Sequence, residues 1–122
     1  MPPVEGHSSR SKANIARRFT ELIEEDPALL IGEAARQLGV TMAILRACCR
    51  SCFDMSPTAY RRHQRLGAVR RILQQANPGE VYVFNVAADH GFYQIGKFSV
   101  LYRKTFGEKP SMTLAQRAVS VE

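Results

Sequence analysis

The sequence predicts an all-α protein in which a long linker helix joins two helix-turn-helix lobes. Apolar residues recur at the spacing of amphipathic helices, residues that favour helix ends separate these segments, and one motif occurs twice. About seven helices are expected, and they cover residues 12–25, 31–38, 41–53, 57–75, 85–90, 93–106 and a short stretch from residue 110.

The first helix follows a polar beginning, residues 1–11, which we expect to be a disordered tail. Over residues 12–25 apolar side chains recur every third or fourth position, which is the pattern of an amphipathic helix. Asp26-Pro27 ends this helix, because the residue before a proline is biased away from helical angles.

The next two helices belong to the first copy of the repeat. Gly39 closes the second helix, and Thr41 suits the N-cap position of the third. Asp54 follows the third helix, where the second copy has Gly107. Both residue types tolerate the left-handed conformation that ends helices, glycine more readily.

Ser56 and Pro57 begin the linker helix, because serine favours the N-cap and proline favours the first helical position. Asn77-Pro78-Gly79 stops this helix. Four apolar residues at helical spacing are expected in the core: Leu66, Val69, Ile72 and Leu73.

The second lobe begins with an apolar run, Val81–Phe84, that periodicity does not assign. We expect this run to lead into a helix over residues 85–90 with Asn85 as its N-cap. Gly91 then turns the chain, Gly107 caps the helix over residues 93–106, and the last helix begins at residue 110. The expected parts are a disordered tail (1–11), a first lobe (12–56), the linker helix (57–76), a second lobe (77–115) and a final tail (116–122).

Each copy of the repeat has the residues that a helix-turn-helix requires. Ala35 and Ala87 are small enough for two helices to cross closely, and Gly39 and Gly91 can take the positive φ of a tight turn. The copies are offset by 52 residues up to the turn and by 53 after it. Apolar residues anchor the second helix of each copy: Leu45, Cys48 and Cys49 in the first, and Phe98, Leu101 and Tyr102 in the second. A plain helical hairpin is the alternative, but a doubled motif in a basic chain favours DNA.

The charge distribution also favours an anionic partner. The 122 residues carry a net charge of +6, with a pI near 9.7. Residues 1–40 have a net charge of −1, and residues 41–122 have a net charge of +7. The positive charge therefore lies with the repeat copies and the segment between them, as in proteins that bind nucleic acid.

Several short motifs lie in the repeat and the linker: Ser56-Pro57, Tyr60, Arg65-Leu66, Arg70-Arg71-Ile72-Leu73, Gly91-Phe92, Phe98-Ser99, Phe106-Gly107 and Lys109-Pro110-Ser111. Together they resemble the DNA-binding domain of the AraC/XylS family, over roughly residues 13–114. The resemblance implies a transcription regulator whose two lobes read adjacent major grooves on one face of double-stranded DNA. RNA polymerase is a further candidate partner.

The resemblance also implies which side chains of the first copy face DNA: Thr41, Ala43, Arg46 and Arg50. Arg46 is the expected base reader, because its guanidinium can donate to guanine O6 and N7 together, although a solvated arginine is the alternative. Arg50 is better placed for a phosphate. The family usually has arginine at the position of Ala47, so the first lobe lacks one contact near DNA, for which the neighbouring Arg46 could compensate. The family usually has an aromatic residue at the position of Cys49, so we expect the second lobe to be better packed.

In the second copy, the stretch expected to face the groove contains Gln94, Ile95, Gly96, Lys97, Ser99 and Val100. Lys97 is the strongest candidate for base contact, followed by Gln94. Gly96 would permit close approach of the backbone, and Arg103 and Lys104 would meet phosphates. The linker arginines are either a solvated face or phosphate contacts, and Arg65 is a candidate structural contact.

Other functions find less support. Cys48, Cys49 and Cys52 could form a thiol or zinc site, but core packing of the first two is the simpler interpretation. The three histidines are scattered, and no phosphate loop or catalytic triad occurs, so we expect no enzyme, no metal and no cofactor. The alternative function is a basic helical module that binds proteins or responds to thiol oxidation, without specific DNA readout.

The remaining expectations concern the cell and the rest of the protein. No apolar run approaches the ~20 residues that span a membrane, and the N-terminus lacks the apolar core of a signal peptide. We therefore expect a cytoplasmic, monomeric chain. It has no room for a separate sensing domain, so it is either an isolated DNA-binding portion or a short regulator.

Overall fold

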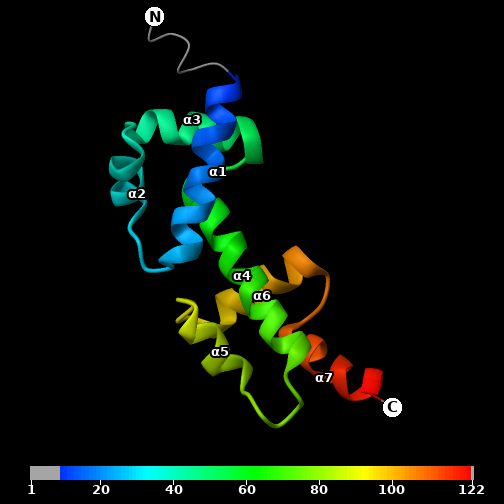
Figure 1. Cartoon of the computed structure of the whole chain (residues 1–122). Coiled ribbons are helices and arrows are strands. Elements are labelled where there is room, and N and C mark those ends of the chain that lie inside the picture. The colour runs from blue at the N-terminus through cyan, green and yellow to red at the C-terminus, as the bar shows by residue number, and fades with distance from the viewer. Residues whose placement is uncertain (1–8, 122) are drawn as a thin grey trace, which may run out of the picture. The chain divides into compact units, whose positions relative to one another are not determined.

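The computed structural model describes the backbone of residues 9–121, in which it places seven helices (Figure 1). They are α1 (Ser9–Glu25), α2 (Ile31–Leu38), α3 (Met42–Phe53), α4 (Pro57–Gln75), α5 (Val83–Asp89), α6 (Ile95–Phe106) and α7 (Pro110–Val121). Over this range no strand is formed, and Pro78 and Val81 make an isolated bridge. The all-α prediction is confirmed.

The chain divides into two compact units, residues 1–62 and residues 63–122. Helix α4 crosses this division, so Tyr60 packs against the core of the first unit, whereas Leu66 lies in the core of the second. The boundary therefore falls inside the predicted linker helix, and each part of this helix contributes to the core of a lobe.

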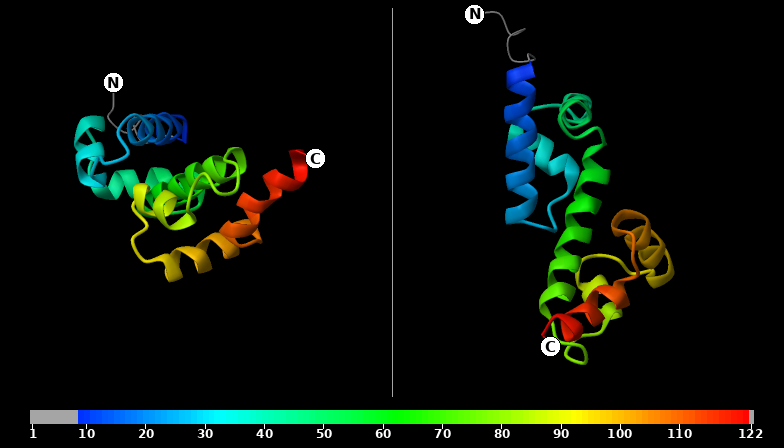
Figure 2. Two further views of the ribbon diagram at one scale, coloured as in Figure 1. Left: turned by 90° about the horizontal axis from the view of Figure 1, so that it is seen from below. Right: turned by 90° about the vertical axis from the view of Figure 1, so that its right-hand side faces the viewer.

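In the first unit, α1 lies against both α2 and α3 (Figures 1 and 2). The buried core contains Phe19, Ile23, Ala34, Ala35, Leu45 and Cys49. Ala35 is 3% exposed, as expected for a small residue at the crossing of two helices. Cys48 and Cys49 are also buried, which confirms their predicted place in the core.

The predicted turn between α2 and α3 and the predicted caps of α3 are confirmed. Gly39 is left-handed (φ 72°), and the N–H of Val40 donates to the carbonyl of Ala35 at 3.1 Å. The hydroxyl oxygen of Thr41 accepts a hydrogen bond from the N–H of Ile44 at 3.2 Å, so Thr41 is the N-cap of α3. Asp54 ends α3 at φ 57°.

The core of the second unit contains Leu66, Val69, Leu73, Val86, Ala87, Phe98 and Tyr102. The prediction that Ile72 is buried is wrong, because this residue is 38% exposed. Leu66, Val69 and Leu73 follow one stripe of α4, whereas Ile72 is rotated by about 100° from Leu73 and falls at the edge of that stripe.

Helix α5 begins before the predicted position. Its N-cap is Tyr82, which has an extended backbone (φ −108°, ψ 132°), so Asn85 is not the N-cap. Val83, Val86 and Ala87 all pack in the core. Their spacing brings them to one face only when the helix already includes Val83.

Helix α6 begins after the predicted position. Its first residue is Ile95 and its N-cap is Gln94, whereas the prediction included Tyr93 in the helix. Gln94 lies 53 residues after Thr41, the N-cap of α3. The register of the repeat therefore sets the start of α6.

Both predicted tails need correction where the structure describes them. Helix α1 begins at Ser9, so residues 9–11 are helical rather than disordered, and residues 1–8 lie outside the described part. Helix α7 continues to Val121, so residues 116–121 extend the last helix instead of forming a tail.

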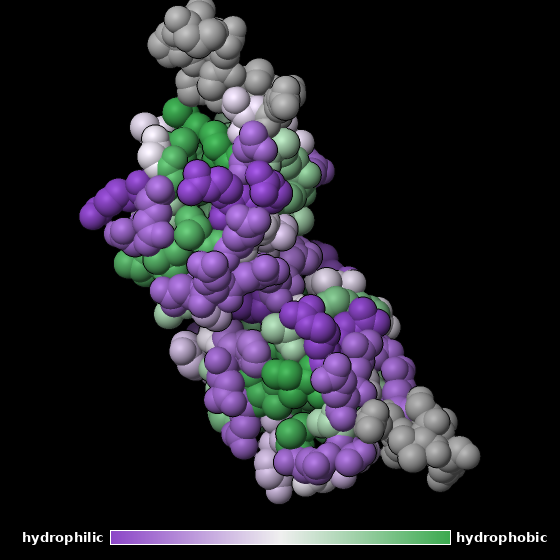
Figure 3. Space-filling model, in the orientation of Figure 1, coloured by the Kyte–Doolittle hydropathy of each residue, from purple (hydrophilic) through white to green (hydrophobic). Residues whose placement is uncertain are grey.

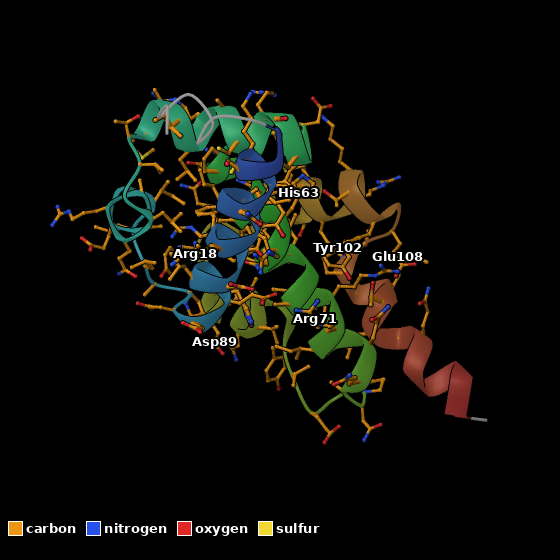
Figure 4. All side chains as sticks on the ribbon, turned by 45° about the horizontal axis from the view of Figure 1, so that its top comes forward. Arg18, His63, Arg71, Asp89, Tyr102 and Glu108 are labelled. Atoms are coloured by element: carbon orange, nitrogen blue, oxygen red, sulfur yellow. The ribbon has the colours of Figure 1, made fainter. Side chains whose placement is uncertain are left out.

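A hydrogen-bond network with a buried centre at Tyr102 and Thr113 joins α6 to α7, and Figure 4 labels its Tyr102 and Glu108. The hydroxyl of Tyr102 donates to Oγ1 of Thr113 at 2.7 Å, and the hydroxyl of Thr113 donates to the Glu108 carboxylate. Gln116 also donates to this carboxylate, at 2.8 Å. The bonds from Thr113 and Gln116 lower the pKa of Glu108, because they favour its charged form.

The two units each pack a tyrosine ring in or against the core, but on different helices. The repeat offset of 53 pairs Cys49 with Tyr102 and Tyr60 with Thr113. In the first unit the small residue is on α3, and the Tyr60 ring of α4 lies 4.2 Å from Phe53 and 6.3 Å from Phe19 between centroids. Tyr60 thus supplies an aromatic ring to the core in which Cys49 has only a small side chain. The better packing of the second lobe stays a prediction.

Replacing Thr113 by Val should destabilise the second unit by about 1–3 kcal/mol, because the buried Tyr102 hydroxyl loses its partner. Urea unfolding followed by circular dichroism measures this loss. The exposed Ser111 on the same helix is the control, and Ser111→Ala should change stability by less than about 0.5 kcal/mol. Equal stability of the Thr113→Val and wild-type chains would contradict the role of the network.

Replacing Tyr60 by Thr should destabilise the first unit by about 3 kcal/mol, because a large half-buried ring is lost. Adding Cys49→Tyr to the same chain should restore part of that stability, since it recreates the arrangement of the second unit. Cys49→Tyr alone should destabilise by overpacking. Urea unfolding of the three variants measures this coupling, and additive losses would disprove the exchange.

Candidate nucleic-acid interface

Helices α3 and α6 follow the two turns and are called here the recognition helices. Each buries one face in its own unit: α3 through Leu45, Cys48 and Cys49, and α6 through Phe98 and Tyr102. The opposite face of each helix is exposed to solvent. The turn therefore presents one exposed helix face in each unit.

In α3, the predicted site residues lie on the exposed face. Ala43, Arg46 and Arg50 are exposed, with the two arginines four positions apart and thus on neighbouring turns. Arg50 also donates to the carbonyl of Asp54 at 3.4 Å, which holds it near the C-terminal end of α3. Thr41 lies at the N-terminal end, where its hydroxyl oxygen accepts the capping bond.

In α6, most predicted site residues are also exposed. Gln94 is the N-cap and makes no side-chain capping hydrogen bond. Ile95, Gly96, Lys97 and Arg103 are exposed, and Ser99 is half-buried. In α3 the predicted residues thus share one helix face, whereas in α6 they spread around the exposed surface, with Ile95 and Lys97 about 160° apart about the helix axis.

Two hollows lie on either side of α6. The first, called the α6 groove, has a volume of about 430 Å³ and is lined by Val83, Phe84, Ile95, Ser99, Val100, Arg103, Lys109, Pro110 and Ser111. The second is more open and is lined by Gly96, Lys97, Val100, Leu101 and Lys104. Val100 is common to both, and no lining residue of either hollow carries a carboxylate.

The sequence did not single out Phe84 or Lys109 as site residues, although both line the α6 groove. Phe84 belongs to the apolar run that periodicity left unassigned. This residue is 56% exposed, and the sequence alone does not show that its apolar side chain lies at the surface. Lys109 stands in the motif Lys109-Pro110-Ser111, which could have placed it at the start of α7.

The arginines of α4 differ in their surroundings. Arg61 donates to the backbone carbonyl of Leu29, so it is a structural contact of the first unit. The guanidinium of Arg65 packs over the turn at Gly91, where a Cβ would lie 3.2 Å from its Nη1 atom. The guanidinium of Arg70 lies 4.8 Å from the centroid of the Phe106 ring, while Arg71 is exposed. Three of these arginines thus stabilise the units.

Two of the three cysteines, Cys48 and Cys49, are buried, and Cys52 is exposed. Burial raises the pKa of Cys49 to about 12, and burial and the neighbouring Cys52 raise the pKa of Cys48. Both thiols therefore stay protonated near neutral pH, and the exposed Cys52 is a single thiol. Among the side chains that the structure describes, those of residues 11–116, no three His, Cys, Asp or Glu are grouped so that they could hold a metal ion.

Hydrophobic and hydrophilic residues are interspersed over the face drawn in Figure 3. In the part of the chain that the structure describes, no helix combines the length and apolar character needed to cross a membrane.

A helix-turn-helix domain family matches residues 34–116 of the chain. The chain is 40% identical over 62 residues to the XylDLEGF operon transcriptional activator 1 of Pseudomonas putida, a match that covers 51% of this chain and 19% of that protein. It is 29% identical over 100 residues to the probable thc operon regulatory protein of Rhodococcus erythropolis, covering 82% of this chain and 30% of that protein. The chain thus spans less than a third of the length of these relatives.

Solved structures are similar over most of the chain. A transcriptional regulator with an AraC-type DNA-binding domain from Chromobacterium violaceum has a TM-score of 0.78 and 25% identity, covering 86% of this chain and 93% of that one. A probable AraC family transcriptional regulator from Rhodopseudomonas palustris has a TM-score of 0.77 and 27% identity, covering 85% of this chain and 97% of that one. With the family match over residues 34–116, these likenesses establish that the chain belongs to the AraC/XylS family of helix-turn-helix DNA-binding transcription regulators.

Proposed function

We propose that the chain binds double-stranded DNA in a sequence-specific manner, with α3 in one major groove and α6 in the next. The observation that carries this proposal is the repeated geometry of the two recognition helices. Each follows a turn with a left-handed glycine, Gly39 (φ 72°) or Gly91 (φ 89°), and each exposes a basic face. Family membership makes duplex DNA the favoured partner of these faces.

The exposed residues divide into base readers and phosphate contacts. Arg46 on α3 and Lys97 on α6, both exposed, are the proposed readers, together with Gln94 at the N-cap. Thr41, Ala43, Ile95, Gly96 and Ser99 would line the base-facing surface, and Arg50 and Arg103 would meet phosphates. Arg103 lies in the last turn of α6, where a cation also complements the helix dipole.

The wider role rests on the relatives. One relative is described as an operon transcriptional activator, so we propose that the chain regulates transcription, with RNA polymerase as a partner and with no catalytic activity. We propose that the isolated chain acts as a monomer in the cytoplasm. The alternative is a basic module that binds proteins, which the doubled basic faces make less favourable.

Selection of bound sites from a random pool of duplexes should return two short boxes about one helical turn apart, because each lobe reads its own groove. The logarithm of the affinity should fall linearly with the logarithm of salt concentration as phosphate contacts release counterions. A single box would contradict the two-lobe proposal, and no duplex binding at low salt would favour the protein-binding module.

Replacing Lys97 by Ala should change the preferred sequence of one box only and weaken binding to that box by about 1–3 kcal/mol. The measurement is a repeat of the selection, followed by titration of duplexes that carry each box in altered form. Arg18→Ala is the control, because it removes the same charge from the exposed face of α1. Equal effects of the two substitutions would show that Lys97 acts only through net charge.

A further inference from the structure

An apolar side chain stands in the middle of the exposed face of α6. Val100 is 70% exposed and lines both hollows beside this helix. It is four residues beyond Gly96 and three before Arg103, which places all three on one side of the helix, opposite the buried Phe98 and Tyr102. Any ligand that approaches this face of α6 meets the isopropyl group of Val100.

The α6 groove continues this apolar surface. Beyond Val100, its apolar lining comes from Val83, Phe84, Ile95 and Pro110, of which Phe84 is 56% exposed and Ile95 is 37% exposed. These side chains neither donate nor accept hydrogen bonds, so they gain free energy only by covering apolar atoms. A base edge in the major groove offers one such group, the C5 methyl of thymine.

The charges around Val100 decide what kind of ligand fits. Arg103 and Lys109 line the α6 groove, and Lys97 and Lys104 line the hollow on the other side of Val100. No carboxylate lines either hollow. An apolar centre with cations on both sides matches duplex DNA, in which thymine methyl groups lie between two rows of phosphates.

The first lobe does not offer the same surface. The repeat offset pairs Val100 with Ala47 and Ile95 with Met42, and the latter is only half-exposed. Ala47 is smaller than Val100, so the α3 face has less apolar surface at this position. Arg46 stands where α6 has Ser99, so the α3 face is also more strongly charged. The two recognition helices therefore differ in what their central residues can contact.

From this arrangement we propose that the second lobe reads a thymine through its methyl group, with Val100 as the specificity-determining contact and the α6 groove beside it. This inference rests on the proposed DNA binding and deepens it. It makes the box of the second lobe depend on a thymine that no hydrogen-bonding side chain of α6 needs to touch.

The test uses the duplex selected with the whole chain and replaces each thymine in turn by deoxyuridine, which removes only the C5 methyl. For the wild-type chain, one replacement in the second lobe's box should weaken binding about fourfold, the affinity equivalent of one buried methyl group. For Val100→Ala, binding to the unmodified duplex should be weaker, and the same replacement should have no effect.

Met112→Ala is the matched control, because Met112 is a 54% exposed apolar residue of the same unit that lines neither hollow. This variant should keep the full sensitivity to deoxyuridine. Since Val100 is exposed and alanine favours helices, circular dichroism should show unchanged folding of Val100→Ala.

Three outcomes would overturn the inference while leaving DNA binding intact. In the first, the wild-type chain binds every deoxyuridine duplex as tightly as the unmodified duplex. In the second, Val100→Ala loses as much affinity on deoxyuridine replacement as the wild-type chain does. In the third, Val100→Ala weakens binding to all duplexes equally, whichever thymines they carry. The first is also the result expected if the groove serves a protein partner. A wild-type chain that selects no duplex would instead remove the proposed function itself.

Discussion

The close crossing of two short helices is the constraint on which both lobes depend. Ala35 and Ala87 are buried at these crossings, and Gly39 and Gly91 take positive φ in the turns that follow. A larger residue at either alanine would separate the helices and disturb a closely packed core. Because the same two requirements are met in both lobes, each recognition helix is held with one face in its own core and the other in solvent.

Within this shared frame, the two units fill their cores in different ways. The second unit buries Tyr102 on α6, and the hydroxyl of that residue needs Thr113, which in turn bonds Glu108. The first unit has Cys49 at the corresponding place and supplies a ring from α4 through Tyr60. A core tolerates such a change when the total volume of its side chains is kept. The loss of an aromatic ring at Cys49 is therefore explained by the ring that Tyr60 adds.

The sequence predicted the seven helices, the turns and the face of each recognition helix, because caps, glycines and apolar spacing are local signals. It misplaced the starts of α5 and α6, since packing of Val83 and the repeat register, rather than the nearest capping residue, decide them. It also could not show that Phe84 and Lys109 flank α6, because this depends on how α5 and α7 pack against that helix. The exposure of Val100 became informative only once the buried face was known.

The two turns differ in how freely their sequences can drift. A Cβ at position 39 would meet no atom within 4 Å, so Asn, which visits the left-handed region at modest strain, would fit there. At position 91 a Cβ would lie 3.2 Å from the Arg65 guanidinium, so strain and crowding act together. Over evolutionary time, the turn before α6 is therefore the less permissive of the two, and it ties one arginine of α4 to one glycine of the second lobe.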